Sequence, residues 1–196
     1  MKTTLFAIAC CSCTPHLYSD SAEPIVADTQ CENLDNGWTQ NGHPDGLVAE
    51  GSAEGQVPPN FLLMDQLGQE TCLWQFYGKW IVLDFSTVWC GPCQTLAEDA
   101  GETHTEFESR GLEYLSVLSQ NLNFETPTLE DVQAWADRFE LETPVLVDDV
   151  DWTGNFVAGA SGFPRLVILG PDMRIVESQV TPANDATLRA TLEELL

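Results

Sequence analysis

Apolar residues recur along the second two thirds of the chain, in short runs typical of buried strands and at spacings typical of amphipathic helices. The predicted strands are, in chain order, Phe61–Met64, Cys72–Phe76, Ile81–Ser86, Leu112–Ser119, Pro144–Val147, Arg165–Leu169 and Met173–Val180. Helices are predicted from Gly91 to Ser109, after the capping-box pair Thr128 and Asp131, and at the C-terminus, where Leu188, Leu192 and Leu195 share one face. This alternation indicates one α/β domain with a mixed sheet and helices on both faces.

The first part of the chain lacks this periodicity. Residues 14–57 are rich in Asp, Asn, Gly and Pro, which predicts an irregular extension or tether before a folded domain at 58–196. Trp38 and the pair Leu47-Val48 are the apolar positions of this segment that we expect to pack against the domain.

Residues 1–13 have the features of a short export signal: one positive charge, a brief apolar run and small residues before Cys10. The run is far below the ~20 residues of a membrane-spanning helix. Ala7-Ile8-Ala9-Cys10 is similar to a bacterial lipobox, although Ala7 stands where Leu is usual. A lipid anchor at Cys10 is therefore one hypothesis, and a plain cleaved signal or a mis-set start codon is the other. Export predicts an extracytoplasmic location, in the periplasm or on a bacterial membrane.

The charge balance is strongly acidic. Seven Lys and Arg face 31 Asp and Glu, which gives a net charge of −24. Such a surface repels phosphate backbones, so no nucleic-acid partner is expected. A highly solvated surface explains this charge better than a specific acidic binding face does. The hydrophobic content of 43% is that of a globular protein.

Two cysteines, Cys90 and Cys93, stand where the predicted strand Ile81–Ser86 gives way to a helix. Backbone N–H groups and the helix dipole at that point favour a thiolate over a thiol. Cys93 lies on the apolar stripe of the helix and is predicted to face the protein body, whereas Cys90, at the cap, is predicted to face solvent. An exposed nucleophilic thiolate and a shielded resolving thiol are what dithiol–disulfide exchange needs.

The other cysteines leave two questions open. The total of seven is odd, and Cys31 with Cys72 is a candidate structural disulfide if the compartment is oxidising. A zinc site built on Cys90 and Cys93 is an alternative, but no second Cys or His pair follows at short spacing. We expect no metal and no bound cofactor, because a dithiol carries the electrons itself.

The motif Trp89-Cys90-Gly91-Pro92-Cys93, placed between a strand and a helix, resembles the active site of the thioredoxin-fold family. From about Pro58 to Leu196 the chain is similar to the TlpA/ResA-like extracytoplasmic thiol-disulfide oxidoreductases. This resemblance implies a thioredoxin-like fold, with a mixed central sheet flanked by helices. It implies that Cys90 attacks the substrate, that Cys93 resolves the mixed disulfide and that Trp89 shapes the rim.

The resemblance also implies roles for two residues outside the motif. Asp84 matches the buried acid that relays a proton for the resolving cysteine, and a lone carboxylate in an apolar strand would have a raised pKa. A solvated, edge-facing Asp84 is the alternative. Pro164 matches the family's cis-proline, whose loop lies against the cysteines and pairs with substrate, although Phe163 departs from the Thr, Ile or Val common there. An ordinary trans-proline is the alternative.

Three functional hypotheses follow from these residues. The first is a monomeric thiol-disulfide oxidoreductase that reduces protein disulfides and is recharged by a membrane electron donor. The second is a peroxiredoxin-like thiol peroxidase, because Asn121–Val150 resembles the insertion that TlpA-like proteins and peroxiredoxins share. Thr87 fits the peroxiredoxin motif, but Leu83 stands where that motif has proline. The third is a non-catalytic thioredoxin-like lipoprotein that serves as a binding module.

Overall fold

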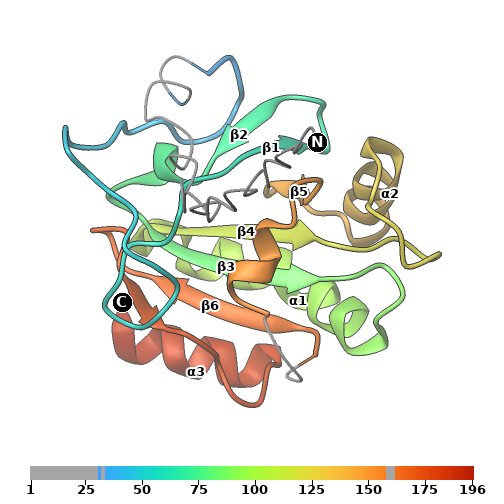
Figure 1. Cartoon of the computed structure of the whole chain (residues 1–196). Helices are drawn as coiled ribbons and strands as arrows, with labels where there is room; N and C mark the ends of the chain where they lie inside the picture. The colour runs from blue at the N-terminus through green and yellow to red at the C-terminus, as the bar shows by residue number, and fades with distance from the viewer. Residues whose placement is uncertain (1–30, 32–33, 158–161) are drawn as a thin grey trace, which may run out of the picture.

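A mixed β-sheet forms the centre of the computed structural model, which describes residues 31, 34–157 and 162–196 (Figure 1). The strands of this described part are β1 (Leu62–Asp65), β2 (Glu70–Cys72), β3 (Trp80–Ser86), β4 (Leu112–Leu118), β5 (Val145–Val147), β6 (Arg165–Leu169) and β7 (Ile175–Glu177). They lie in the order β2-β1-β5-β4-β3-β6-β7. The pairs β3–β4 and β4–β5 are parallel, and the other neighbours are antiparallel.

The α-helices of the described residues all pack on one face of this sheet. They are α1 (Gly91–Phe107), α2 (Leu129–Phe139) and α3 (Asp185–Leu195), and their buried side chains share one core cluster with Val82, Tyr114 and Ile168 of the strands. The predicted capping box is confirmed at α2, where Thr128 and Asp131 each accept a hydrogen bond from the other's backbone N–H. Helix α1 begins at Cys90 as its N-cap.

The opposite face of the sheet carries a second core cluster, which includes Ile81, Leu83 and Phe85 of β3. It is covered by the 3-10 helices η2 (Trp74–Phe76) and η4 (Trp152–Asn155) and by irregular chain before β1. In Figure 1 the orange turn before β6 lies in front of the sheet and α1 lies behind it. Helices were expected on both faces of the sheet. On this face the described residues form only short 3-10 helices, so the expectation is met in part.

The predicted strand Cys72–Phe76 is wrong in its second half. The strand ends at Cys72, and Trp74–Phe76 is a 3-10 turn. Here side-chain oxygens, and not carbonyl groups of a neighbouring strand, accept the backbone hydrogen bonds. Gln75 Oε1 accepts the Cys72 N–H at 2.9 Å, and Asn60 Oδ1 accepts the Trp74 N–H at 3.0 Å. The strand predicted through Val180 likewise shrinks to β7, beside an irregularity in its register with β6.

The described residues before β1 contain no helix or strand over 34–57, and they lie against the domain. Trp38 and Leu47 pack on the second cluster as predicted, and Trp38 Nε1 donates to the buried Asp65 carboxylate at 2.5 Å. Val48 is 63% exposed, so the prediction that it packs inward is wrong. Cys31 forms a disulfide with Cys72, so the candidate pairing exists in the structure.

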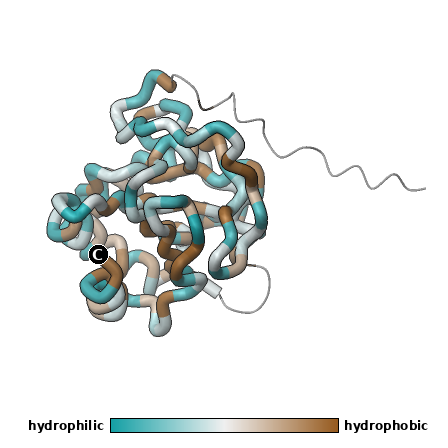
Figure 2. The backbone as a smooth tube through the Cα atoms, turned by 90° about the vertical axis from the view of Figure 1, so that its left-hand side faces the viewer, coloured by the Kyte–Doolittle hydropathy of each residue, from teal (hydrophilic) through white to brown (hydrophobic). Residues whose placement is uncertain are grey.

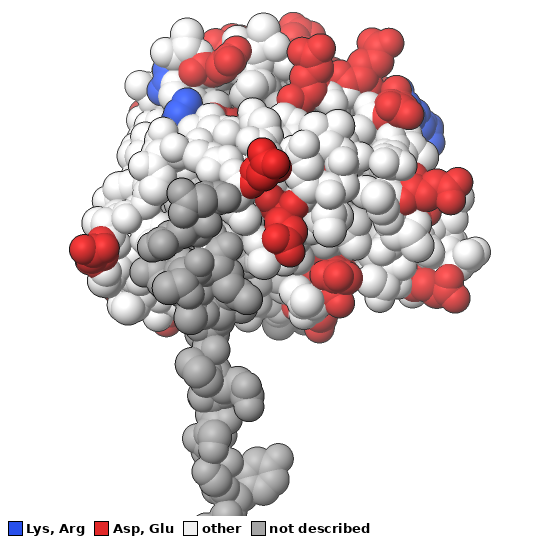
Figure 3. All heavy atoms as spheres, turned by 90° about the horizontal axis from the view of Figure 1, so that it is seen from above, with Lys and Arg blue, Asp and Glu red and all other residues white. Residues whose placement is uncertain are grey.

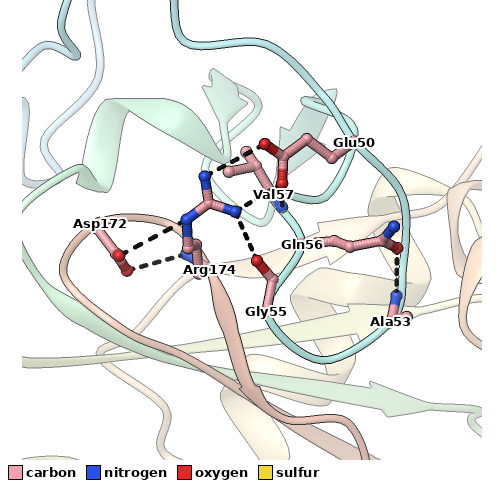
Figure 4. A network of polar contacts seen from close by, with 7 residues as sticks. All are labelled: Glu50, Ala53, Gly55, Gln56, Val57, Asp172 and Arg174. Atoms are coloured by element: carbon pink, nitrogen blue, oxygen red, sulfur yellow. Dashed lines mark hydrogen bonds and ion pairs between the residues drawn. The ribbon is translucent and has the colours of Figure 1, made fainter.

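A second attachment of this segment lies at the opposite edge of the sheet (Figure 4). The Arg174 guanidinium, beside β7, donates to both carboxylate oxygens of Glu50 at 2.6 and 3.2 Å and to the Gly55 carbonyl at 2.5 Å. Ile175 exchanges backbone hydrogen bonds with Gly55 and Gln56 at 2.8 and 2.9 Å. The segment therefore covers the edge of β7, which would otherwise present unpaired backbone groups.

Hydrophobic stretches of the backbone gather in the middle of the molecule, and hydrophilic ones lie on its outer turns (Figure 2). On the face seen in Figure 3, Asp and Glu side chains far outnumber Lys and Arg. Among the described residues, no helix is both long and apolar enough to cross a membrane.

We predict that Cys31→Ser/Cys72→Ser lowers the free energy of unfolding by about 2–4 kcal/mol, because the disulfide closes a loop with a sequence separation of 41. Urea unfolding without reductant measures the loss. Cys90→Ser/Cys93→Ser is the matched control, and its loss should be smaller because the sequence separation is 3. Equal losses in the two double variants would contradict the prediction.

Candidate active site

Cys90 and Cys93 form a disulfide at the first turn of α1, with their Cα atoms 5.2 Å apart. Cys90 is the N-cap of the helix, and its Sγ accepts the Cys93 N–H at 3.2 Å. Pro92 occupies the first turn, where its missing N–H leaves no helical bond unmade. The N–H that now meets Cys90 Sγ is available to stabilise a thiolate on the same atom when the disulfide is reduced.

The prediction that Cys90 faces solvent is wrong, because the residue is only 3% exposed in this disulfide form. Cys93 is 0% exposed, so it is the more deeply buried of the two cysteines, as predicted. Both cysteines belong to the core cluster on the helix-covered face of the sheet, against which Val88 and Phe163 also pack. A partner therefore meets a Cys90 residue that is almost fully covered and not an open helix end.

Asp84 is fully buried on the face of β3 that also carries the helices, so the alternative of a solvated Asp84 is excluded. Ser86 Oγ donates to its Oδ1 at 2.7 Å, and Tyr114 Oη lies 3.4 Å from its Oδ2. Burial raises the pKa of Asp84 to about 7, against the lowering effect of the hydrogen bonds from Ser86 and Tyr114. The carboxyl group is therefore poised to take up or give up a proton near neutral pH.

The Phe163–Pro164 peptide bond is cis, as the resemblance implied. The antiparallel register pairs Phe85 with Arg165, so Pro164 lies beside the end of β3 that leads to Cys90. Sheet pairing thus brings a residue from late in the chain to the cysteine motif.

Trp89 lies at the surface beside the disulfide and is 39% exposed. Its Nε1 donates to Gln120 Oε1 at 3.0 Å, and its ring lies 5.2 Å from the Phe124 ring and 6.3 Å from the Phe163 ring, between centroids. The rim next to Cys90 is therefore aromatic and comes from three separate segments of the chain.

The partners of Asp84 and Trp89 were not predicted from the sequence. Ser86 could have been found, because it lies two residues after Asp84 and so shares its face of the strand. Tyr114 needed the β3–β4 register, and Gln120 and Phe124 needed the path of the loop after β4, which has no periodic signal.

No group of three potential metal ligands occurs among the described residues. In the two disulfides, all four sulfurs of Cys31, Cys72, Cys90 and Cys93 are bonded to sulfur. The proposed lipidation residue Cys10 lies outside the described residues.

Residues 55–178 match the sequence model of the AhpC/TSA family, which is more than half of the chain. The chain belongs to the AhpC/TSA family. A stretch of 65 residues is 34% identical to the thiol-disulfide oxidoreductase ResA of Geobacillus thermodenitrificans, and it covers 33% of this chain and 37% of the relative. ResA of Bacillus subtilis is 34% identical over 68 residues, covering 35% and 38%. The chain thus matches little more than a third of the length of these relatives.

Solved structures agree on the fold. The thioredoxin domain of a thiol-disulfide oxidoreductase from Bacteroides vulgatus superposes with a TM-score of 0.62 at 22% identity, over 73% of this chain and 97% of that one. A thioredoxin-family thiol:disulfide interchange protein from Chlorobium tepidum gives 0.59 at 17% identity, over 77% and 98%. The predicted thioredoxin-like fold and the similarity to ResA-type proteins are confirmed.

We predict that Asp84→Asn stabilises the protein at pH 8. The folded-state pKa of about 7 lies above the ordinary value of 3.8, so the stability that protonated Asp84 contributes is complete below pH 3.8 and is lost as the pH rises through about 7. At pH 8 the variant should gain on the order of a few kcal/mol in unfolding free energy over wild type. At pH 4 the gain should largely vanish.

Urea unfolding at both pH values measures this difference. Asp137→Asn, on the exposed side of α2, is the control and should shift neither value. A gain of equal size at pH 4 and pH 8 would mean that ionisation of Asp84 is not its cause.

Proposed function

We propose that this protein is a thiol-disulfide oxidoreductase that reduces disulfides of polypeptides outside the cytoplasm. The observation that carries the proposal is the Cys90–Cys93 disulfide at the start of α1, with the buried Asp84 carboxyl on the same side of the sheet. The similarity to ResA-type proteins supports the same reaction class.

The reaction has two exchange steps. In the reduced protein the Cys90 thiolate attacks one sulfur of a substrate disulfide, so a Cys90–substrate disulfide forms and the other substrate sulfur leaves as a thiolate. Cys93 then gives its proton to the Asp84 carboxylate and attacks Cys90 Sγ. The Cys90–Cys93 disulfide forms, the second substrate thiolate leaves, and two electrons have passed to the substrate. An external dithiol, which we assign to a membrane electron donor, must then reduce the protein again.

The asymmetry of the two cysteines supports these roles. Cys90 Sγ has the helix N-terminus and the Cys93 N–H to stabilise negative charge, so it is the better thiolate. Cys93 is fully buried and needs a base, and a carboxyl with a pKa of about 7 is suited to that task at neutral pH. Pro164 beside the end of β3 offers its loop backbone to the substrate chain, and Trp89 forms the rim.

The direction and the location rest on further features. Gly91-Pro92 between the cysteines is the dipeptide of reducing thioredoxins, which supports a reductase with a potential of about −270 mV. The Cys31–Cys72 disulfide is typical of an oxidising compartment, which supports export. A structural neighbour is described as a secreted Mycobacterium tuberculosis disulfide oxidoreductase. We assign the export signal to residues 1–13, with lipidation at Cys10.

The family match also makes a thiol peroxidase the second candidate. Hydrogen peroxide consumption with dithiothreitol as donor separates the two activities. Rapid peroxide consumption without insulin reduction would overturn the proposed function and identify the protein as a thiol peroxidase.

We predict that Cys90→Ser lowers dithiothreitol-driven insulin reduction to the uncatalysed background, because no thiolate remains to attack. Cys93→Ser should retain the first step and accumulate a mixed disulfide with substrate, visible on a non-reducing gel. Light scattering by the precipitating insulin follows the rate. Cys90→Ser with wild-type turnover would leave the protein as a binding module.

Asp84→Asn should slow the second step and leave the first nearly unchanged, because only Cys93 needs a buried base. Stopped-flow Trp fluorescence with excess substrate disulfide separates the two phases. Glu98→Gln, an exposed acid on α1, is the control and should change neither phase. Equal slowing of both phases would remove Asp84 from the relay.

A further inference from the structure

Exposed apolar side chains gather beside the disulfide on the side of the loop after β4. Trp89 is 39% exposed, Phe124 65% and Val150 64%. The Trp89 and Phe124 rings contact each other, and Phe124 lines a hollow of about 400 Å³ together with Val150. Neighbouring apolar side chains that remain exposed to solvent are typical of a binding surface.

The loop that carries Phe124 is firmly built. Asn121 is 9% exposed, and its Oδ1 accepts the N–H groups of Asn123 and Glu125 at 2.9 and 3.1 Å. Phe124 itself has a φ of 63°, a left-handed conformation that is uncommon for a bulky residue. Since Phe124 is 65% exposed, core packing does not account for an aromatic residue at this position.

Acidic residues surround the same hollow. Its lining includes the exposed Glu125, Asp149 and Asp151, and none of its lining residues is Lys or Arg. Asp148 also lines it, but its carboxylate accepts the N–H groups of Trp152 and Thr153 at 2.7 Å and so serves the fold. The hollow therefore offers the apolar side chains of Phe124 and Val150, together with unneutralised negative charge, to whatever binds beside Cys90.

We propose that Trp89, Phe124 and Val150, with Glu125 and Asp149, form a docking surface that selects the substrate polypeptide by the residues next to its reacting cysteine. The surface takes a segment with a large apolar side chain and a Lys or Arg beside the cysteine. This inference rests on the proposed function, because it assigns a substrate class to the same disulfide. A second copy of this chain, at a net charge of −24, and an anionic lipid surface both lack the required charge.

The test uses three peptides, each joined through its one cysteine to 2-mercaptoethanol as a mixed disulfide. The cysteine is followed by Leu-Lys, Leu-Glu or Gly-Gly, and bis(2-hydroxyethyl) disulfide is the small neutral substrate. Release of peptide thiol with dithiothreitol as donor gives kcat/KM. Wild type should prefer the Leu-Lys peptide over the Leu-Glu peptide by about tenfold at low salt, and less at high salt.

Two variants separate the charge from the apolar contact. Glu125→Gln/Asp149→Asn should lose most of the preference for Lys over Glu. Phe124→Ala should lower kcat/KM for both Leu peptides by about tenfold and leave the Gly-Gly peptide nearly unchanged. The control Glu140→Gln/Glu142→Gln removes the same charge from a separate hollow near the C-terminal half of α1, and it should keep the wild-type preference.

The small disulfide distinguishes a failure of the docking surface from a failure of the proposed function. If wild type reduces bis(2-hydroxyethyl) disulfide but treats the three peptides alike, the docking surface is overturned and the proposed function stands. If wild type and every variant fail to reduce all four substrates, the proposed function is overturned instead. Equal loss of the Lys preference in the control variant would assign the preference to overall charge and overturn the local surface.

Discussion

The burial of β3 on both faces and along both edges is the constraint on which the site depends. Its side chains belong alternately to the two core clusters, and β4 and β6 pair with it on either side. A shift by one residue would exchange the side chains of β3 between the two clusters, and the Asp84 carboxyl would leave the face that carries the helices. Asp84 therefore stays under the helices, the chain leaves the sheet at Ser86, and α1 begins at Cys90.

That fixed strand also explains how distant residues meet without a dedicated scaffold. The parallel partner β4 brings Tyr114 to the Asp84 carboxyl, and the antiparallel partner β6 begins one residue after Pro164. The loop after β4 continues from the same edge and carries Gln120 to Trp89. Tyr114, the cis-proline and Gln120 thus come from the two strands that pair with β3 and from the loop after one of them, as expected where ligand sites lie at the ends of sheet strands.

Sequence periodicity predicted those parts of the molecule in which one face is buried. The capping box of α2 and the beginnings of β3 and α1 followed from local patterns, because caps and amphipathic stripes depend on neighbours within a few residues. The turn at Trp74–Phe76 did not, because Asn60 lies 14 residues from the Trp74 N–H that it accepts. Near the site, the exposure of Cys90 was mispredicted because the core cluster to which it belongs includes residues far along the chain, such as Leu166 and Leu188. Phe124 gave no signal, since an exposed aromatic residue in a polar loop has no period.

The irregular chain before β1 has a consequence for where the folding unit begins. The family match starts at residue 55, but Trp38 and Leu47 already complete the second core cluster, and Glu50 binds Arg174. A shortened chain that began at residue 55 would leave the Asp65 carboxylate without the Trp38 N–H and open one side of the sheet to water. The folded domain of this protein therefore begins before residue 55, where the family match starts.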